Sequence, residues 1–407
     1  MPPSSPFNRL AWSNLAAQSA DQIALAAAPL VAVVALGAGP GEAGMLQTAQ
    51  TLPFLLLALP AGVLADRMAR KTLMAWAEAA RAIGLGCAAL LLATNVLSLG
   101  ALALFGFLCA AGTVAFGVAS PGLVASLVPP GGLARANGRI ELARTLAFVA
   151  GPAAGGVLAG AFGGIPAFVL GALLSALAAA LLGGLPEMRI GAGGPATERH
   201  PFREAGEGAA FVLGHALLRP VLLTQIVFNA AFFVLQAIYV PYAVEKLGLD
   251  GVEVGWTLAT YGAGMLVGVA LAPRAMSLLP FGTVVVIGPI CGFAASVVMA
   301  ATIVWPSGAL AALSFFLIGV GPILWVIATM TLRQAATPGP LLGRVSSIFM
   351  MATGARPIGA AIGAGLAASL GMEACLIAAT LGFALQAGII LRSPVVPMIE
   401  VPKATGP

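Results

Sequence analysis

The sequence predicts an all-α membrane protein with twelve transmembrane helices, arranged as two six-helix halves that repeat in the same orientation. The first observation is composition: 60% of the 407 residues are hydrophobic, 8% are charged, and the mean hydropathy is +1.03. So apolar a chain has too little polar surface to cover a water-soluble globule. The second observation is a series of long apolar runs, and the third is a pair of motifs that return in the second half.

Twelve apolar runs of about 18 to 25 residues lie along the chain, each long enough to cross the hydrocarbon core of a bilayer. Hydrocarbon offers no hydrogen-bond partner, so each run is expected to satisfy its own backbone as a helix. The first run is too long for the apolar region of a signal peptide, and we expect it to be retained. The expected spans are 11 to 36, 43 to 65, 73 to 95, 98 to 120, 140 to 162, 165 to 185, 218 to 243, 252 to 273, 281 to 304, 307 to 332, 343 to 370 and 374 to 392.

Two motifs divide these helices into halves. With an even number of helices between the copies, the halves are expected to share one orientation. We therefore predict an N-terminal bundle at residues 1–185, a cytoplasmic linker at 186–217 and a C-terminal bundle at 218–407. The paired motifs are Leu64-Ala65-Asp66-Arg67 with Leu271-Ala272-Pro273-Arg274, and Gly138-Arg139 before Pro152 with Gly343-Arg344 before Pro357.

The linker carries an apolar stripe at helical spacing, which predicts a short helix lying on the membrane surface. The rest of the linker is rich in glycine, proline and polar residues. The stripe consists of Phe202, Ala205, Ala209, Val212 and Leu213.

Charge placement predicts the orientation. With both termini in the cytoplasm, nearly every basic residue of the loops falls on that side, and Lys246 alone falls on the other. The expected location is the inner or plasma membrane, crossed many times. The net charge of +5 and pI near 9.4 then reflect topology, and we expect no nucleic-acid partner.

Residue types needed for enzyme chemistry are missing from the apolar runs. The four cysteines lack metal-ligand spacing, both histidines (His200 and His215) lie in the linker, and no phosphate-binding loop or serine nucleophile motif occurs. The sequence therefore predicts a protein that is not an enzyme and that needs no metal or other cofactor.

A short basic segment between the second and third runs has a recognisable pattern, GVLADRMARK. It resembles the signature of the Major Facilitator Superfamily, with Ala69 where the pattern has its second glycine. The resemblance covers nearly the whole chain and implies that the segment latches the halves on the cytoplasmic side, through the amino end of helix eleven near Gly343 to Ser346. The alternative is a loop that only sets topology. The matching residues are Gly62, Leu64, Asp66, Arg67, Arg70 and Lys71.

A second resemblance lies in helix five. Gly151, Pro152, Gly155 and Gly156 match the core of an exporter motif, with Ala147 in place of its first glycine. A packing kink at a helix contact is the simpler alternative. Three further segments make the chain similar to the branch of enterobactin exporters and macrolide efflux pumps: the opening FNRLAWSNLAAQSADQIALAAAPL, the segment LARANGRIELAR from Leu133 to Arg144, and the segment from Leu342 to Ala361. Drug antiporters of the superfamily carry an arginine in helix four, and this chain has no charge between Ser98 and Ser120.

Charges inside the apolar runs are candidates for proton coupling, because each costs about 2.5 to 3.5 kcal/mol at mid-helix. Two pairs, Glu78 with Arg81 and Glu141 with Arg144, stand three residues apart and near the cytoplasmic loops. We expect each pair to form along one face of its helix, near enough to the cytoplasmic loop for the side chains to snorkel, with pairing between helices as the alternative.

Asp21 and Arg356 stand apart from opposite charges along their own helices, each about 18 Å beyond a cytoplasmic arginine. We hypothesise that Asp21 exchanges a proton as water enters and leaves a cavity, and that Arg356 binds an anionic substrate group or neutralises Asp21. A static bridge between the two is the alternative.

The sequence thus favours a secondary transporter that exports small lipophilic or amphipathic compounds by alternating access and proton antiport. Proton-coupled or facilitated uptake, and a non-transporting receptor of the same fold, remain alternatives. Its expected partners are the lipid bilayer, a small-molecule substrate and protons, and we expect a monomer. The cavity implied by the resemblance would be lined by Gln18, Gln22, Gln225, Asn229, Phe233, Gln236 and Trp325.

Overall fold

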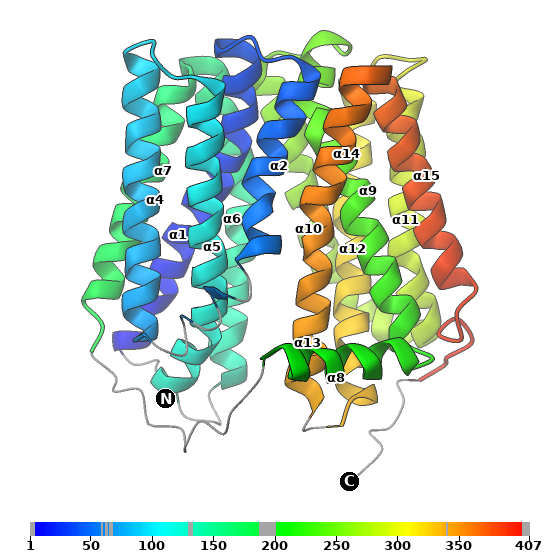
Figure 1. Cartoon of the computed structure of the whole chain (residues 1–407). Helices are drawn as coiled ribbons and strands as arrows, with labels where there is room; N and C mark the ends of the chain where they lie inside the picture. The colour runs from blue at the N-terminus through cyan, green and yellow to red at the C-terminus, as the bar shows by residue number, and fades with distance from the viewer. Residues whose placement is uncertain are drawn as a thin grey trace. The chain divides into compact units, whose positions relative to one another are not determined.

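The computed structural model describes residues 5–57, 60, 61, 64, 68–128, 133–186, 201–338 and 341–400. This part of the chain is helical and contains no strand, which confirms the predicted fold class (Figure 1). The helices are α1 (Ser5–Leu30) continued by the π-helix η1 (Val31–Ala35), α2 (Pro40–Leu56), α4 (Arg70–Ala93), α5 (Leu99–Leu127), α6 (Leu133–Phe162), α7 (Gly164–Gly183), α8 (Pro201–Gly214), α9 (Leu218–Glu245), α10 (Gly251–Leu278), α11 (Phe281–Ala301), α12 (Gly308–Ala336), α13 (Leu342–Met351), the 3₁₀ turn η4 (Ala352–Gly354), α14 (Ala355–Leu370) and α15 (Met372–Leu391).

Eleven helical spans within the described residues are long and apolar enough to cross a membrane. The remaining predicted span, 43 to 65, corresponds to α2, and residues 58, 59, 62, 63 and 65 of that span lie outside the described residues. The tryptophans fit a bilayer environment, since Trp12, Trp76, Trp256 and Trp305 are all exposed. Such residues are enriched at membrane interfaces, where an amphipathic ring meets the headgroups.

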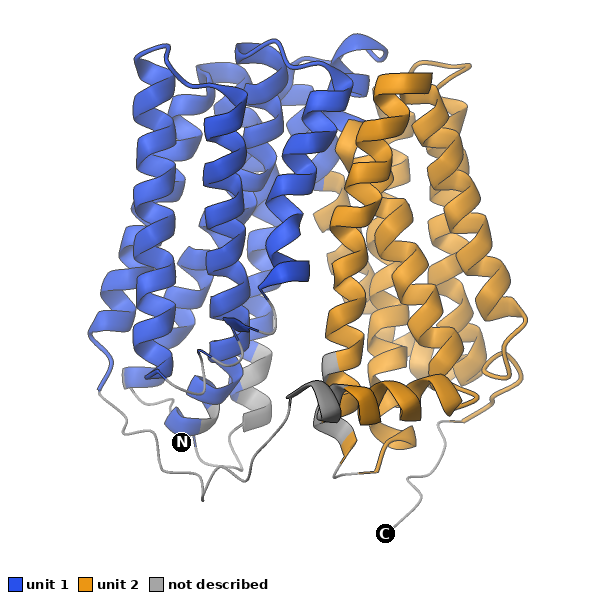
Figure 2. Ribbon diagram, in the orientation of Figure 1, with its two compact units in different colours: residues 1–193, 239–259 blue, residues 194–238, 260–407 orange. Residues whose placement is uncertain are grey.

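The chain forms two compact units (Figure 2). Unit 1 contains residues 1–193 and 239–259, and unit 2 contains residues 194–238 and 260–407. The carboxyl end of α9 and the amino end of α10 therefore belong to unit 1 although they follow the linker in sequence. The division of the chain at 185 and 218 remains a prediction from the repeated motifs.

The helix ends repeat between the two halves of the sequence. Each half has a glycine with positive φ after its first helix, Gly37 at 67° and Gly248 at 68°. Each also joins its last two helices through one glycine, Gly163 (φ 75°) and Gly371 (φ 89°), a conformation that costs glycine little. A duplicated six-helix unit is expected to have glycines of the same conformation at matching turns in both copies.

Serine caps repeat in the same way. The hydroxyl oxygen of Ser98 accepts a hydrogen bond from the Ala101 N–H at the start of α5. Ser307 does the same for Leu310 at the start of α12. Such caps satisfy a backbone donor that a helix leaves unpaired at its first turn.

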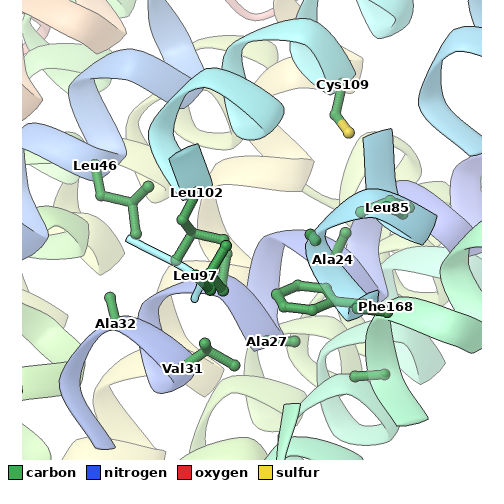
Figure 3. Packing of buried hydrophobic residues seen from close by; sticks show 14 of the residues in the cluster. Ala24, Ala27, Val31, Ala32, Leu46, Leu85, Leu97, Leu102, Cys109 and Phe168 are labelled. Carbon is green, nitrogen blue, oxygen red and sulfur yellow. The ribbon is translucent and has the colours of Figure 1, made fainter. Parts of the chain in front are cut away.

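The core of unit 1 is built from small residues of α1 packed against larger ones from neighbouring helices. Ala27 of α1, with Val31 and Ala32 of its continuation η1, is buried among side chains such as Leu85 of α4 and Phe168 of α7 (Figure 3). Small side chains let helices approach closely where lipid provides no hydrophobic drive between them. α1 packs mainly against α6 and α7, and α4 packs against α5 and α7.

The predicted linker helix is present as α8, which belongs to unit 2. Figure 1 shows α8 running crosswise at one end of the helices of this unit. Val212 is fully buried in the core of unit 2, whereas Leu213 is exposed. The apolar stripe therefore anchors α8 through Val212, and Leu213 faces away from that core.

Candidate functional site

Three helices of unit 1 converge on Arg81, whose side chain is 2% exposed. Arg81 Nη1 donates to Glu78 Oε1 at 2.8 Å and to Oε2 at 3.0 Å. Its Nη2 atom donates to Thr113 Oγ1 of α5 at 2.6 Å and lies 3.7 Å from Asp21 Oδ1 of α1. The guanidinium thus joins α1, α4 and α5 through a single buried side chain.

Glu78 and Arg81 form the expected pair along one face of α4, but both side chains are buried and do not snorkel, and Arg81 also approaches Asp21 of α1, the contact between helices kept as the alternative. Glu78 has no exposed surface. Removing either partner would leave an uncompensated charge inside the bundle, which is strongly unfavourable. This requirement explains why the two charges turn inward although α4 begins only about 10 Å away from Glu78.

Asp21 is held by hydrogen bonds from two sides. The Thr113 hydroxyl donates to Asp21 Oδ1 at 2.7 Å, and Gln22 Nε2 donates to Asp21 Oδ2 at 3.3 Å. Its side chain keeps 20% of its surface exposed, in contrast to Glu78. Asp21 has no opposite charge near it along its own helix, as expected, but Arg81 of α4 approaches it from another helix.

The charges at this site do not balance. Two carboxylates, Asp21 and Glu78, face one guanidinium, so the ionised site carries one net negative charge in surroundings of low polarity. Of the two carboxylates, Asp21 keeps access to solvent, whereas Glu78 is fully buried.

Arg81 also contacts α5, the fourth apolar span of the chain. Its Nη2 atom donates to the Cys109 carbonyl at 3.3 Å as well as to Thr113, so the positive charge of this α4 residue lies against α5. Spacing within one helix could not reveal this contact.

Unit 2 contains a second polar cluster around Arg356. Arg356 Nε donates to Asn229 Oδ1 at 3.0 Å, and the guanidinium carbon lies 5.5 Å from the centre of the Phe233 ring. Gln225 Nε2 donates to the Phe349 carbonyl at 2.9 Å. This cluster combines a cation, amides and an aromatic face, as a pocket for an amphipathic compound would.

The helix that carries Arg356 is interrupted next to it. α13 ends at Met351, η4 covers Ala352–Gly354, and α14 begins at Ala355. A 3₁₀ stretch within a helix often marks a hinge, so Arg356 stands one residue beyond a candidate bending point. In unit 1, α1 similarly ends in the π-helix η1.

The remaining cavity candidates fall in different surroundings. Gln22 is buried against Gly151 of α6, while Gln18 and Gln236 are half-buried. Trp325 is buried in the core of unit 2, where its side chain packs over Gly288 of α11. Trp325 thus packs within this core, and its buried indole nitrogen has no hydrogen-bond partner among the residues that the structure describes.

Glu141 and Arg144 lie on an exposed face of α6. Their closest atoms are 2.6 Å apart, and their side chains are 58% and 45% exposed. The guanidinium carbon of Arg144 also lies 5.7 Å from the centre of the Phe148 ring. An exposed pair of this kind contributes little to stability and differs from the buried pair on α4.

Only part of the basic signature falls within the described residues. Gly62, Asp66 and Arg67 lie outside them, so the proposed latch remains a prediction. Leu64 is exposed, Arg70 begins α4 with its guanidinium against Gly122 of α5, and Lys71 Nζ donates to the Leu185 carbonyl at 2.9 Å.

The start of α13, which the latch would use, contacts the linker helix. Arg344 forms an ion pair with Glu207 of α8, and Gly208 lies against the Arg344 backbone. Both helices belong to unit 2.

The glycines of the helix-five motif make close backbone contacts within unit 1. Gly151 and Gly155 leave room for α1 at Gln22 and Ile23. Gly156 lies against Gly255 at the amino end of α10, so closely that a Cβ atom on either glycine would meet the other backbone. The motif is thus a packing surface on two sides of α6.

The model of the Major Facilitator Superfamily matches residues 10–364. The chain belongs to the Major Facilitator Superfamily. This result confirms the resemblance found in the sequence and establishes a multi-pass membrane transporter rather than an enzyme.

Among curated proteins, the chain is similar to the multidrug efflux pump Tap of Mycobacterium tuberculosis strain H37Rv and of Mycobacterium bovis BCG Pasteur. Each is 26% identical to it over 276 residues. The match spans 63% of this chain and 62% of the length of these relatives.

Solved structures share the fold of this superfamily member. The nucleoside transporter NupG has a TM-score of 0.75 at 12% identity, covering 95% of this chain and 98% of that one. A bacterial homolog of the human lysosomal transporter Spinster has a TM-score of 0.74 at 16% identity, with 97% and 98% covered. At these identities the likeness establishes the fold alone.

Proposed function

We propose that this transporter exports small lipophilic or amphipathic compounds in exchange for protons. The observation that supports the proposal is the unequal charge of the buried site, in which Asp21 and Glu78 share Arg81. The similarity to a multidrug efflux pump supports export. The proposed transporter works as a monomer in the inner or plasma membrane, with both termini in the cytoplasm.

The proposed cycle uses Asp21 as the proton carrier. When a proton binds, the Asp21, Glu78 and Arg81 group becomes neutral, and α1, α4 and α5 are held together without a net buried charge. When the proton leaves, the negative charge returns and favours a conformation that admits water. Alternation between these states would couple proton entry to a conformational change.

The proposed substrate site lies around Arg356 in unit 2. Because Arg81 already lies beside Asp21, we assign Arg356 to the substrate rather than to charge neutralisation. Phe233 offers an aromatic face, and Asn229 and Gln225 offer amides. An apolar pocket with few polar groups suits an amphipathic compound better than a sugar, whose hydroxyls need many partners.

Transport direction is tested by intracellular accumulation of a compound panel at two external pH values. Cells expressing the wild type are compared with cells expressing Asp21→Asn and with cells expressing Glu141→Gln, a matched change on an exposed face. Export predicts lower accumulation with the wild type and Glu141→Gln, and more strongly at the lower external pH. Higher accumulation with the wild type than in cells without the protein would show uptake and overturn the proposed direction.

A further inference from the structure

A groove runs along the surface of unit 1 between α1, α6 and α7. It encloses about 750 Å³. Its walls are apolar, formed by Leu15 and Ala16 of α1, Leu146 and Ala150 of α6, and leucines of α7. Leu146 and Leu177 remain strongly exposed, as side chains facing lipid would be.

One end of the groove is polar and positive. Asn8, Arg9 and Trp12 line this end. Arg9 Nη1 donates to the Gly184 carbonyl at 2.6 Å, and Arg139 Nη1 donates to Asn8 Oδ1 at 3.0 Å. Within the described residues neither arginine has a carboxylate partner. Arg9 therefore lines the polar end as a cation, and Arg139 reaches this end through its hydrogen bond to Asn8, with its guanidinium 5.5 Å from the centre of the Phe7 ring.

The length of the groove matches one leaflet. From Arg9 to Ser19, α1 rises about 15 Å, half of a hydrocarbon core that is about 30 Å thick. Trp12 lies beside the polar end, where an amphipathic ring meets lipid headgroups. A ligand that fills this groove therefore has one apolar chain of leaflet length and a negative group at its end.

We propose that the groove binds one acyl chain of an anionic phospholipid, with the phosphate held by Arg9 and Arg139. The two guanidiniums supply charge complementarity, and hydrogen-bond geometry favours arginine for phosphate oxygens. Neither Asp21 nor Arg356 lines this groove.

Native mass spectrometry of the detergent-solubilised full chain tests the proposal, with phosphatidylglycerol and phosphatidylcholine of identical acyl chains as probes. We expect the wild type to retain one phosphatidylglycerol at concentrations where phosphatidylcholine is lost. Arg9→Gln and Arg139→Gln should each weaken phosphatidylglycerol retention by about fivefold. Arg274→Gln, which removes an exposed arginine from α10, should leave it unchanged.

Variants that fill the groove with a large side chain provide a second test of the proposal. Ala150→Trp should abolish retention of phosphatidylglycerol, whereas Leu173→Trp, on an exposed face of α7 outside the groove, should not. In the wild type, phosphatidylglycerol with a photoactivatable acyl chain should label α1, α6 or α7. This mapping gives a result even if the tryptophan variant does not fold.

Several results would overturn the proposal. These are equal retention of the two lipids by the wild type, equal retention by Ala150→Trp and the wild type, and photolabelling confined to other helices. Binding of tetraphenylphosphonium in the groove without retention of phosphatidylglycerol would also overturn it and would indicate lateral entry of cationic compounds.

Discussion

Arg81 Nη2 lies 3.7 Å from Asp21 Oδ1 and shares the Thr113 hydroxyl with it, which accepts from Arg81 and donates to Asp21. This relationship links the one partly exposed carboxylate of the buried site to a guanidinium that is also bound by Glu78. A change in the protonation of Asp21 would therefore be felt on α1, α4 and α5 at once.

We expect Arg81→Met to destabilise the protein strongly. The variant leaves Glu78 buried without its cation, a loss of about 3 to 5 kcal/mol. Thermal unfolding in detergent should show a clearly lowered midpoint, partly restored in the double variant Glu78→Gln, Arg81→Met. Arg144→Met removes an exposed arginine with the same i, i+3 spacing and should change the midpoint little. An unchanged midpoint for Arg81→Met would contradict the buried bridge.

The close contact of α6 with α10 predicts that replacing glycine by alanine lowers the stability of the protein at Gly255 but not at Gly86, a glycine of α4 with open space around it. Gly255→Ala places a methyl group against the Gly156 backbone and should destabilise by about 1 to 3 kcal/mol. Gly86→Ala, in α4, meets open space and should be neutral or slightly stabilising. The two unfolding midpoints in detergent measure the difference, and equal midpoints would argue against the close approach.

His215 lies between α8 and α9, and we expect it to stabilise the first turn of α9 in a way that depends on pH. Its Nδ1 accepts from the Leu217 and Leu218 N–H groups at 3.2 and 3.4 Å, and burial lowers the pKa of the imidazole. The imidazole of His215 therefore binds a proton more tightly in the unfolded segment than in the folded one. The hydrogen bonds of the neutral imidazole contribute fully to stability above its ordinary pKa of about 6.5, and this contribution is lost as the pH falls below that value.

Hydrogen exchange at Leu217 and Leu218, corrected for the intrinsic rate at each pH, measures this effect. Protection should fall between pH 7.5 and pH 5.5 in the wild type. His215→Asn provides a cap that does not titrate in this range and should show constant protection. A wild type with the same protection at both pH values would refute the capping role.

Arg356 is expected to select for an anionic group on the transported compound. Arg356→Gln should weaken transport of an anionic amphipathic compound by at least about tenfold, because a charge-assisted hydrogen bond is lost. A neutral analogue should lose much less. Competition assays with both compounds check this difference, with Arg274→Gln as the control. Equal losses for the two compounds would contradict a role in anion selection.

The fold was largely predictable from sequence. The thickness of the hydrocarbon core fixes how long an apolar run must be, and the need to hydrogen-bond every backbone group in lipid makes each run a helix. The repeat was predictable too, although its clearest signals were missed. Gly37 and Gly248, with Glu42 and Glu253 each five residues later, mark equivalent turns before α2 and α10. Both glutamates accept a backbone hydrogen bond near the amino end of their helices.

The site was predictable only in part. Asp21 and Arg356 stand out by depth, but the partner of Asp21 lies on another helix, and spacing along one helix carries no information about such contacts. A signal was present: Arg81 lies ten residues beyond Lys71, about 15 Å along α4 and close to the depth of Asp21. The packing of Trp325 over Gly288 was not predictable for a related reason, since Gly288 belongs to a neighbouring helix.

Proton movement in proteoliposomes tests the central claim most directly. With a transported compound supplied on one side, wild-type protein should move protons in the opposite direction, recorded by a pH-sensitive dye. Asp21→Asn should fold, insert and bind the compound, and it should lose this proton movement. Substrate-dependent proton movement that is undiminished in Asp21→Asn would contradict the account.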